Sequence, residues 1–158
     1  MKRAGSYRPM TPAQMQEFHA NLQDKYGYCY FADPEHRIEH RCTGRSWGMH
    51  LYPQSQLKRD FREGAWKMPD GQFWRPLTRQ TPNRKGMVTL TLGEICSDTR
   101  FGVPGCDGIH APFDNNIDLR REAFPILPPD FMRVVRAYQL EAAVELYYGL
   151  KPYSLEAR

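Results

Sequence analysis

The longest periodic stretch of the chain lies near its C-terminal end and constrains the fold more than any other feature. Pro128-Pro129-Asp130 precedes a helical pattern that continues to about Tyr148, where Gly149 and Pro152 end it. Apolar positions at steps of three and four residues form one stripe: Phe131, Val134, Val135, Tyr138, Ala142 and Leu146. A second apolar strip consists of Met132, Leu140, Val144 and Tyr147. A helix this broadly apolar requires burial on two sides, either inside its own domain or against a partner.

A second helix is predicted near the other end, from about Thr11 to Tyr26. Thr11 and Gln14 have the spacing of a capping box, Pro12 suits the first helical position, and Gly27 suits the end. A short helix over 33–43, ended by Gly44, is also expected. Together with the C-terminal helix, these segments supply the helical part of the fold.

Strands are expected between these helices. The aromatic run at 28–31 is typical of a buried strand, and Pro69-Asp70-Gly71 predicts a hairpin between 66–68 and 72–74. Alternation from Met87 to Leu92 predicts another strand, while the Gly, Pro, Asp and Asn content of 96–116 is typical of a loop. The prediction is one small α+β domain over residues 1–158, with its terminal helices around a small antiparallel sheet and long irregular loops.

Composition excludes several classes of protein. Hydrophobic residues make up 41% of the 158 residues and the mean hydropathy is -0.70, so no stretch approaches the roughly 20 apolar residues of a membrane span. No apolar run follows the basic residues near the N-terminus, which predicts an intracellular protein without a secretory signal. Four cysteines are too few for a disulfide framework and favour a reducing compartment or a metal site.

Positive charge is concentrated in the middle of the chain. Residues 37–86 carry 11 Lys and Arg against 4 Asp and Glu, whereas residues 87–158 carry 7 against 10. Aromatic residues such as Trp66 and Trp74 alternate with these cations. Rings beside guanidinium groups suit single-stranded RNA and also suit protein interfaces. Because the segment has no RNA-binding signature, a protein partner is the favoured interpretation, and Trp66 and Trp74 are predicted partner-binding residues.

One pentapeptide matches the H-x-x-E-H pattern of zinc peptidases: His36-Arg37-Ile38-Glu39-His40. On a helix, His36 and His40 would share a face as zinc ligands, and Glu39 could activate water. The predicted helix is short and polar, and no third ligand is evident in the sequence. A zinc-dependent hydrolase is therefore an alternative prediction, and the enzyme question stays open with a preference for no enzymatic activity.

A structural zinc site is a second interpretation of the same segment. Its four candidate ligands lie within fourteen residues: Cys29, His36, His40 and Cys42. On a continuous helix Cys42 would face away from His40, so the site requires the helix to end first. A second group, Cys96, Cys106 and His110, offers three ligands in a flexible segment. Zinc is the one cofactor that the sequence suggests, and cysteines buried without metal are the alternative.

The C-terminal segment also resembles a known family. Leu127-Pro128 and the run from Arg133 to Glu141 resemble a helix of the 14 kDa accessory subunit of the mitochondrial cytochrome bc1 complex. The run from Lys151 to Ala157 resembles a later Pro-Tyr-x-Leu-Glu-Ala segment of that family. The match covers about 30 of the 158 residues, and the Leu-Pro…Trp that separates the two segments in the family is absent here.

This resemblance implies a non-catalytic, matrix-side subunit of a respiratory complex that supports assembly. The leading prediction is an accessory or structural subunit of a larger, mitochondrial assembly whose partners are other protein subunits. The helix would contribute partner-binding residues: Arg133, Arg136, Tyr138 and Tyr147. The alternatives are a zinc-binding domain and an RNA-contacting protein of a ribosome-like particle.

Overall fold

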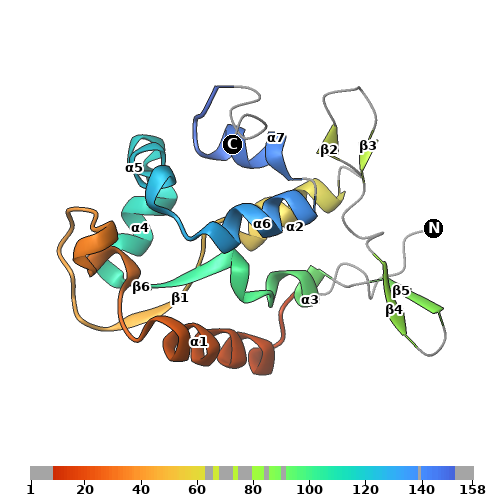
Figure 1. Cartoon of the computed structure of the whole chain (residues 1–158), viewed down its shortest axis with the longest axis horizontal. Coiled ribbons are helices and arrows are strands. Elements are labelled where there is room, and N and C mark those ends of the chain that lie inside the picture. The colour runs from red at the N-terminus through yellow and green to blue at the C-terminus, as the bar shows by residue number, and fades with distance from the viewer. Residues whose placement is uncertain are drawn as a thin grey trace.

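The computed structural model describes residues 9–62, 66–67, 73–74, 80–83, 86–89, 92–138 and 140–151, with the backbone alone between 60 and 89. These residues form an α+β fold in which helices surround one small antiparallel sheet (Figure 1). The helices are α1 (Pro12–Tyr26), α2 (Gln54–Arg62), α3 (Leu92–Cys96), α4 (Asp107–Asn115), α5 (Ile117–Ala123), α6 (Pro129–Ala137) and α7 (Glu141–Tyr147). The predicted fold class is confirmed. No helix in these ranges has both the length and the apolar character needed to cross a bilayer.

Helix α1 begins and ends where the sequence predicts. The Thr11 hydroxyl accepts the Gln14 N–H at 3.1 Å, and the Gln14 side chain accepts the Thr11 N–H at 2.9 Å, which completes the capping box. Gly27 ends the helix with a φ of 81°, a value that side chains with a Cβ rarely adopt. Phe18 and Leu22 are buried, so this face of α1 points into the core.

The central sheet pairs β1 (Ser46–His50) with β6 (Gly102–Cys106) in antiparallel register, from Ser46 opposite Cys106 to His50 opposite Gly102. The prediction of a loop over 96–116 is wrong, because this segment contains β6 and α4. Glycines in the strand pair allow α1 to pack closely against it. A Cβ on Gly48 would lie 2.5 Å from the His19 ring, and one on Gly102 would lie 2.5 Å from Phe18. Helix α1 can therefore lie directly against both strands only because these positions carry no side chain.

Two other strand pairs bear on the predictions. Strands β2 (Trp66–Lys67) and β3 (Phe73–Trp74) pair with Trp66 opposite Trp74, which confirms the predicted hairpin. Strand β5 (Gly86–Thr89) pairs with β4 (Gln80–Asn83), but Leu92 belongs to α3, so the strand predicted to reach Leu92 ends earlier. The side chains of Trp66 and Trp74 lie outside the described residues, as does the partner surface predicted around them.

Two short 3-10 helices, η2 (Tyr30–Ala32) and η3 (Pro34–His36), follow α1 in the chain, and η5 (Thr99–Phe101) lies between α3 and β6. A fourth, η6 (Phe124–Ile126), follows α5. The expected strand over 28–31 is wrong, because η2 occupies this segment. It buries Tyr30 and Phe31 on a turn, where successive aromatic residues can both reach the core.

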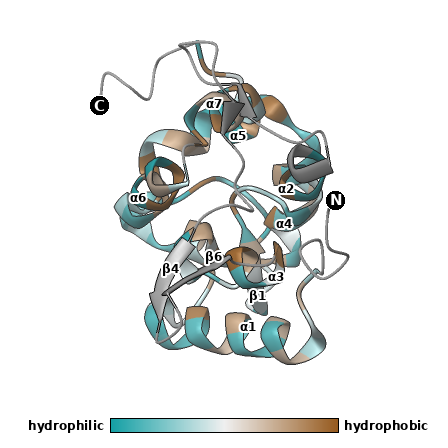
Figure 2. Ribbon diagram, turned by 90° about the vertical axis from the view of Figure 1, so that its right-hand side faces the viewer, coloured by the Kyte–Doolittle hydropathy of each residue, from teal (hydrophilic) through white to brown (hydrophobic). Residues whose placement is uncertain are grey.

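The predicted helix over 129–148 is two helices, α6 and α7, separated near Tyr138 and Leu140. The Leu140 N–H donates to Val135 O at 2.8 Å, a five-residue step that interrupts the α-helical ladder. The break redirects the second apolar strip into the domain, so that Leu140 and Val144 are as fully buried as Val134. Figure 2 shows brown hydrophobic segments alternating with teal ones along these helices.

Two of the four residues predicted to bind a partner through this helix pack within the fold itself. Tyr138 is buried against Phe101, and the Tyr147 ring lies 4.1 Å from the Arg120 guanidinium. Arg133 is exposed and forms an ion pair with Asp130, and Arg136 is also exposed. The burial that the sequence required on two sides is thus supplied largely inside the chain.

Candidate metal centre

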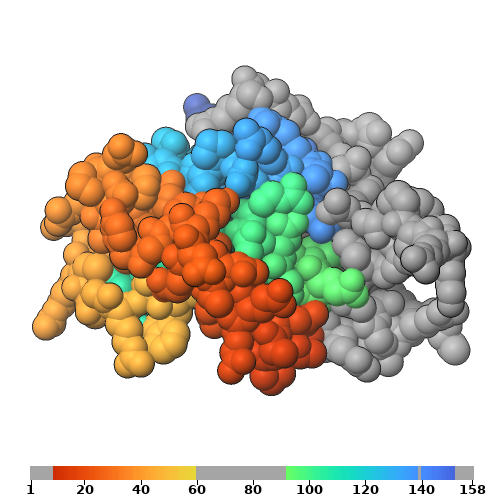
Figure 3. All heavy atoms as spheres, turned by 60° about the horizontal axis from the view of Figure 1, so that its bottom comes forward, coloured from red at the N-terminus to blue at the C-terminus, as the bar shows by residue number. Residues whose placement is uncertain are grey.

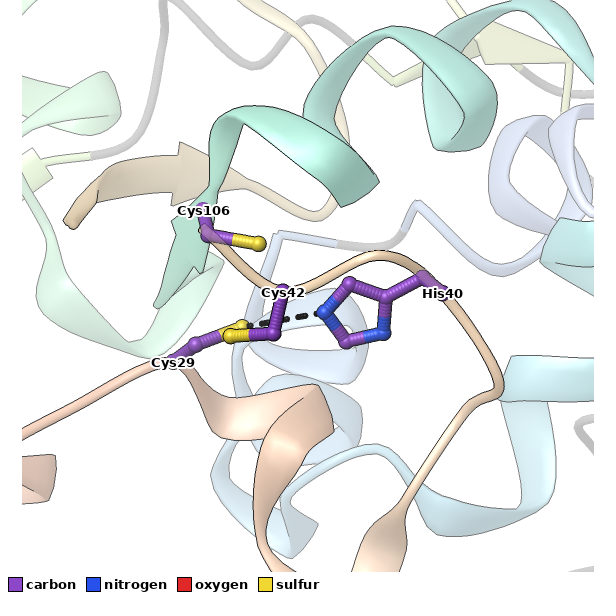
Figure 4. A group of neighbouring side chains, drawn as sticks. All are labelled: Cys29, His40, Cys42 and Cys106. Carbon is purple, nitrogen blue, oxygen red and sulfur yellow. Dashed lines mark hydrogen bonds between the residues drawn. The ribbon is translucent and has the colours of Figure 1, made fainter. Parts of the chain in front are cut away.

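Four potential metal ligands converge where the loop before β1 meets the end of β6 (Figure 4). The sulfur atoms of Cys29, Cys42 and Cys106 and a ring nitrogen of His40 all lie within 4.8 Å of one another. All four cysteines of the chain are free of disulfide bonds. This cluster could hold a metal ion, and it is the only such group of three or more His, Cys, Asp or Glu side chains among the described residues.

Two of the ligands are held by the core. Cys29 lies between the end of α1 and the start of η2, and its carbonyl accepts the Ala32 N–H at 3.1 Å. Cys106 ends β6 and caps α4, and its side chain is fully buried. Both positions are fixed by packed elements, so this half of the site is built by the fold.

The other two ligands come from the irregular segment that follows η3. The Ile38 N–H donates to Phe31 O at 3.1 Å and the Ile38 side chain is buried, which anchors the segment against η2. The backbone is already extended at Arg37, and no helix covers 37–45. Since no helix turns His40 and Cys42 to opposite sides, both side chains can reach the cluster.

The His40 ring is oriented by its own backbone. Its Nδ1 lies 2.6 Å from Ile38 O, and because a carbonyl can only accept, Nδ1 carries the proton. The other ring nitrogen, Nε2, faces the sulfurs and lies 3.7 Å from Cys29 Sγ. A hydrogen bond that fixes the tautomer of a ligating histidine is typical of metal sites.

One pair of ligand atoms has the spacing expected around a tetrahedral ion. With bonds of about 2.3 Å to sulfur and 2.0–2.1 Å to nitrogen, tetrahedral angles place the two ligand atoms about 3.6 Å apart. The 3.7 Å between Cys29 Sγ and His40 Nε2 is close to this value. Three sulfurs and one imidazole form a donor set found in structural zinc sites.

The surroundings favour a thiolate at one position. Burial raises the pKa of the Cys106 thiol, but hydrogen bonds from the Thr43 and Gly108 backbone and from the Cys42 and Cys29 thiols outweigh burial and lower the pKa. Burial raises the pKa of Cys29, its neighbour in the cluster. Since metals bind the thiolate, the lowered pKa of Cys106 favours a role as a metal ligand.

Gly108 permits the loop to approach α4. A Cβ at this position would lie 1.8 Å from the carbonyl oxygen of Arg41, the residue between His40 and Cys42. No side chain fits in that space. The absence of a side chain at Gly108 therefore sets the distance between the two halves of the site.

The structure brings three of the four sequence-predicted ligands together and replaces the fourth. His36 ends η3, its ring stacks on Tyr30 with the centroids 3.7 Å apart, and its Nε2 lies 3.9 Å from Asp33. Cys106 takes the place predicted for His36. The antiparallel pairing of Ser46 with Cys106 closes this long sequence separation, and no local pattern could have indicated it.

The second predicted group does not assemble. Cys96 is buried in α3, where its carbonyl accepts a hydrogen bond from His50 Nε2 at 2.9 Å, while His110 belongs to α4. Neither side chain belongs to the metal-competent cluster.

The arrangement expected for a zinc peptidase is also wrong. The helix that would align His36 with His40 is a single 3-10 turn, because the chain becomes extended at Arg37 to bury Ile38. The Glu39 side chain is 90% exposed and lies 3.9 Å from Arg37. It has no position from which to activate a metal-bound water.

Comparisons of the chain with protein-family models, with curated proteins and with solved structures found no match. The interpretation of this centre therefore depends on its own geometry.

Proposed function

We propose that the chain is a zinc-binding protein in which Cys29, His40, Cys42 and Cys106 hold one structural Zn²⁺. The observation that carries the proposal is the convergence of three sulfurs and an oriented imidazole within 4.8 Å. Thiolate and imidazole donors favour zinc over magnesium or calcium, which prefer oxygen ligands.

The zinc would be structural because four protein ligands complete its coordination. A catalytic zinc normally has three protein ligands and an open position for water. The nearest acidic residue in the loop, Glu39, extends into solvent. The role that follows is mechanical: the ion ties the segment from 37 to 45 to the start of α4 and the end of α1.

Metal content and thermal unfolding test the proposal. The purified chain is expected to hold one zinc per molecule, and a strong chelator should lower its melting temperature, because metal binding is coupled to folding. Cys106→Ser should lose the zinc. Cys96→Ser is the matched control, because it alters a buried cysteine outside the cluster and should retain one zinc per chain.

Two outcomes would contradict the proposal. A chain purified without metal that melts at the same temperature with and without added zinc has no structural site. Equal zinc loss in Cys96→Ser and Cys106→Ser would mean that the metal does not bind at this cluster.

Membership of a larger assembly remains a separate prediction. Arg133 and Arg136 are exposed, whereas the second apolar strip of α6 and α7 is used mainly within the domain. Copurification of stoichiometric protein partners from native lysate would support it.

A further inference from the structure

We propose that the zinc-anchored segment from Arg37 to Trp47 is a binding surface for single-stranded nucleic acid, with Trp47 as the base-stacking platform and Arg41 and Arg45 as phosphate contacts. This surface goes beyond the zinc site and rests on different side chains. Zinc enters the argument only because His40 and Cys42 fix the course of the segment.

The first observation is an exposed aromatic platform. The Trp47 side chain is 41% exposed, although it lies on β1, whose Met49 is buried. The Arg45 guanidinium lies over the ring at 5.0 Å, and the His19 ring approaches it edge-on with the centroids 6.4 Å apart. A ring held in place by two neighbours can stack on a base at little cost in side-chain entropy.

The second observation is uncompensated positive charge. Between 37 and 47 there are three arginines and one acidic residue, Glu39, which lies closest to Arg37. Arg41 and Arg45 are exposed and form no ion pair within 4.0 Å among the described residues. Guanidinium groups free of carboxylates suit phosphate oxygens, with which they form bidentate hydrogen bonds.

The third observation is placement. The space-filling view in Figure 3 shows the orange-to-yellow part of the chain at the surface beside the red α1. Two metal ligands hold the segment at its centre, and β1 holds its far end through the register with β6.

A single strand fits these features better than a duplex, because its bases are free to stack on an indole while its phosphates can meet separated arginines. An indole beside guanidinium groups also suits a protein interface. Binding of oligonucleotides that depends on both Trp47 and the two arginines therefore separates the two classes of partner.

The experiment measures fluorescence anisotropy of labelled 20-nucleotide oligothymidylate and oligouridylate with the zinc-loaded full chain at several salt concentrations. Trp47→Ala should weaken binding about tenfold or more. The double variant Arg41→Gln/Arg45→Gln should reduce the slope of log affinity against log salt by about 1.4, since each single-strand phosphate contact contributes about 0.7. Arg121→Gln/Arg133→Gln removes the same charge from other exposed positions and should leave affinity within about twofold.

The nucleic-acid proposal and the zinc proposal are refuted by different results. Four results would each refute binding of single-stranded nucleic acid at this surface: wild-type affinity in Trp47→Ala, equal losses of affinity in both arginine pairs, tighter binding to a matching duplex, or no binding at low salt. Zinc content of every variant is measured in parallel, because each should retain one zinc. If the protein contains no zinc and its binding to the oligonucleotides still depends on Trp47, the zinc proposal is refuted and the nucleic-acid proposal is not.

Discussion

Replacing Gly108 by alanine tests the metal centre from a residue that is not itself a ligand. An added Cβ would lie 1.8 Å from Arg41 O, whereas real Cβ contacts stay above 3.0 Å. The two backbones must therefore separate by at least 1.2 Å, the difference between these distances. Metal–ligand distances tolerate only about 0.2 Å, so His40 and Cys42 cannot both remain in place beside Cys106.

Zinc affinity of Gly108→Ala is therefore expected to fall at least 10–100-fold, the range found when the support of metal ligands is removed. Overpacking should also lower the free energy of unfolding by about 1–3 kcal/mol. Without the clash the sign would be opposite, because alanine stabilises a helix by about 1 kcal/mol relative to glycine. The sign of the change in the free energy of unfolding therefore shows whether the clash with Arg41 or helix propensity dominates at this position.

Competition between the protein and a chromophoric zinc chelator measures the affinity, and denaturant unfolding with zinc present measures the stability. Gly27→Ala is the control, since its φ of 81° imposes strain while no atom lies within 4 Å of the added Cβ. It should lose stability and keep its zinc affinity. If Gly108→Ala binds zinc as tightly as the wild type, or if both variants lose zinc equally, the contact between Gly108 and Arg41 does not position the ligands.

Two further predictions concern buried polar groups. Burial lowers the pKa of His50 from 6.5 to about 4, so the unfolded chain binds more protons between these values. Stability should then fall by about 3 kcal/mol as pH drops from 6.5 to 4, and denaturant titrations at several pH values should show a shallower fall in His50→Phe. An unchanged pH dependence in that variant would contradict the assignment of this loss of stability to His50. Tyr148 donates to the buried Leu51 O at 2.6 Å, so Tyr148→Phe should cost about 1–2 kcal/mol in the same assay, and a neutral effect would contradict the reasoning.

Local chemistry was enough to predict some elements and not others. Helix α1 follows its capping residues, and the β2–β3 pair follows its turn sequence, because both depend on neighbours within a few positions. Strand β6 has the composition of a loop, yet it pairs with β1 because Gly48 and Gly102 admit α1. Helix packing across a sheet is a tertiary effect that composition does not encode.

The candidate site divides in the same way. Cys29, His40 and Cys42 could be selected from the sequence because their residue types and spacing suit a metal. Cys106 could be placed with them only after β1 and β6 were paired. Burial of the apolar Ile38 ends the predicted helix, so that His36 lies outside the cluster. The apolar Ile38 inside a polar segment is the signal that could have argued against the predicted helix.

The candidate metal centre lies at one end of a very small sheet. An isolated pair of strands is marginally stable in water, and among the described residues β1 and β6 pair only with each other. At one end the pair is held by Phe18, which stacks on His50 at 4.4 Å, and by the Leu51 N–H, which donates to Phe101 O at 2.7 Å. At the Ser46 end the chain enters the irregular segment 37–45, whose His40 and Cys42 converge with Cys29 and Cys106. A metal ion bound by these four side chains would constrain this end of the strand pair, as packing constrains the other.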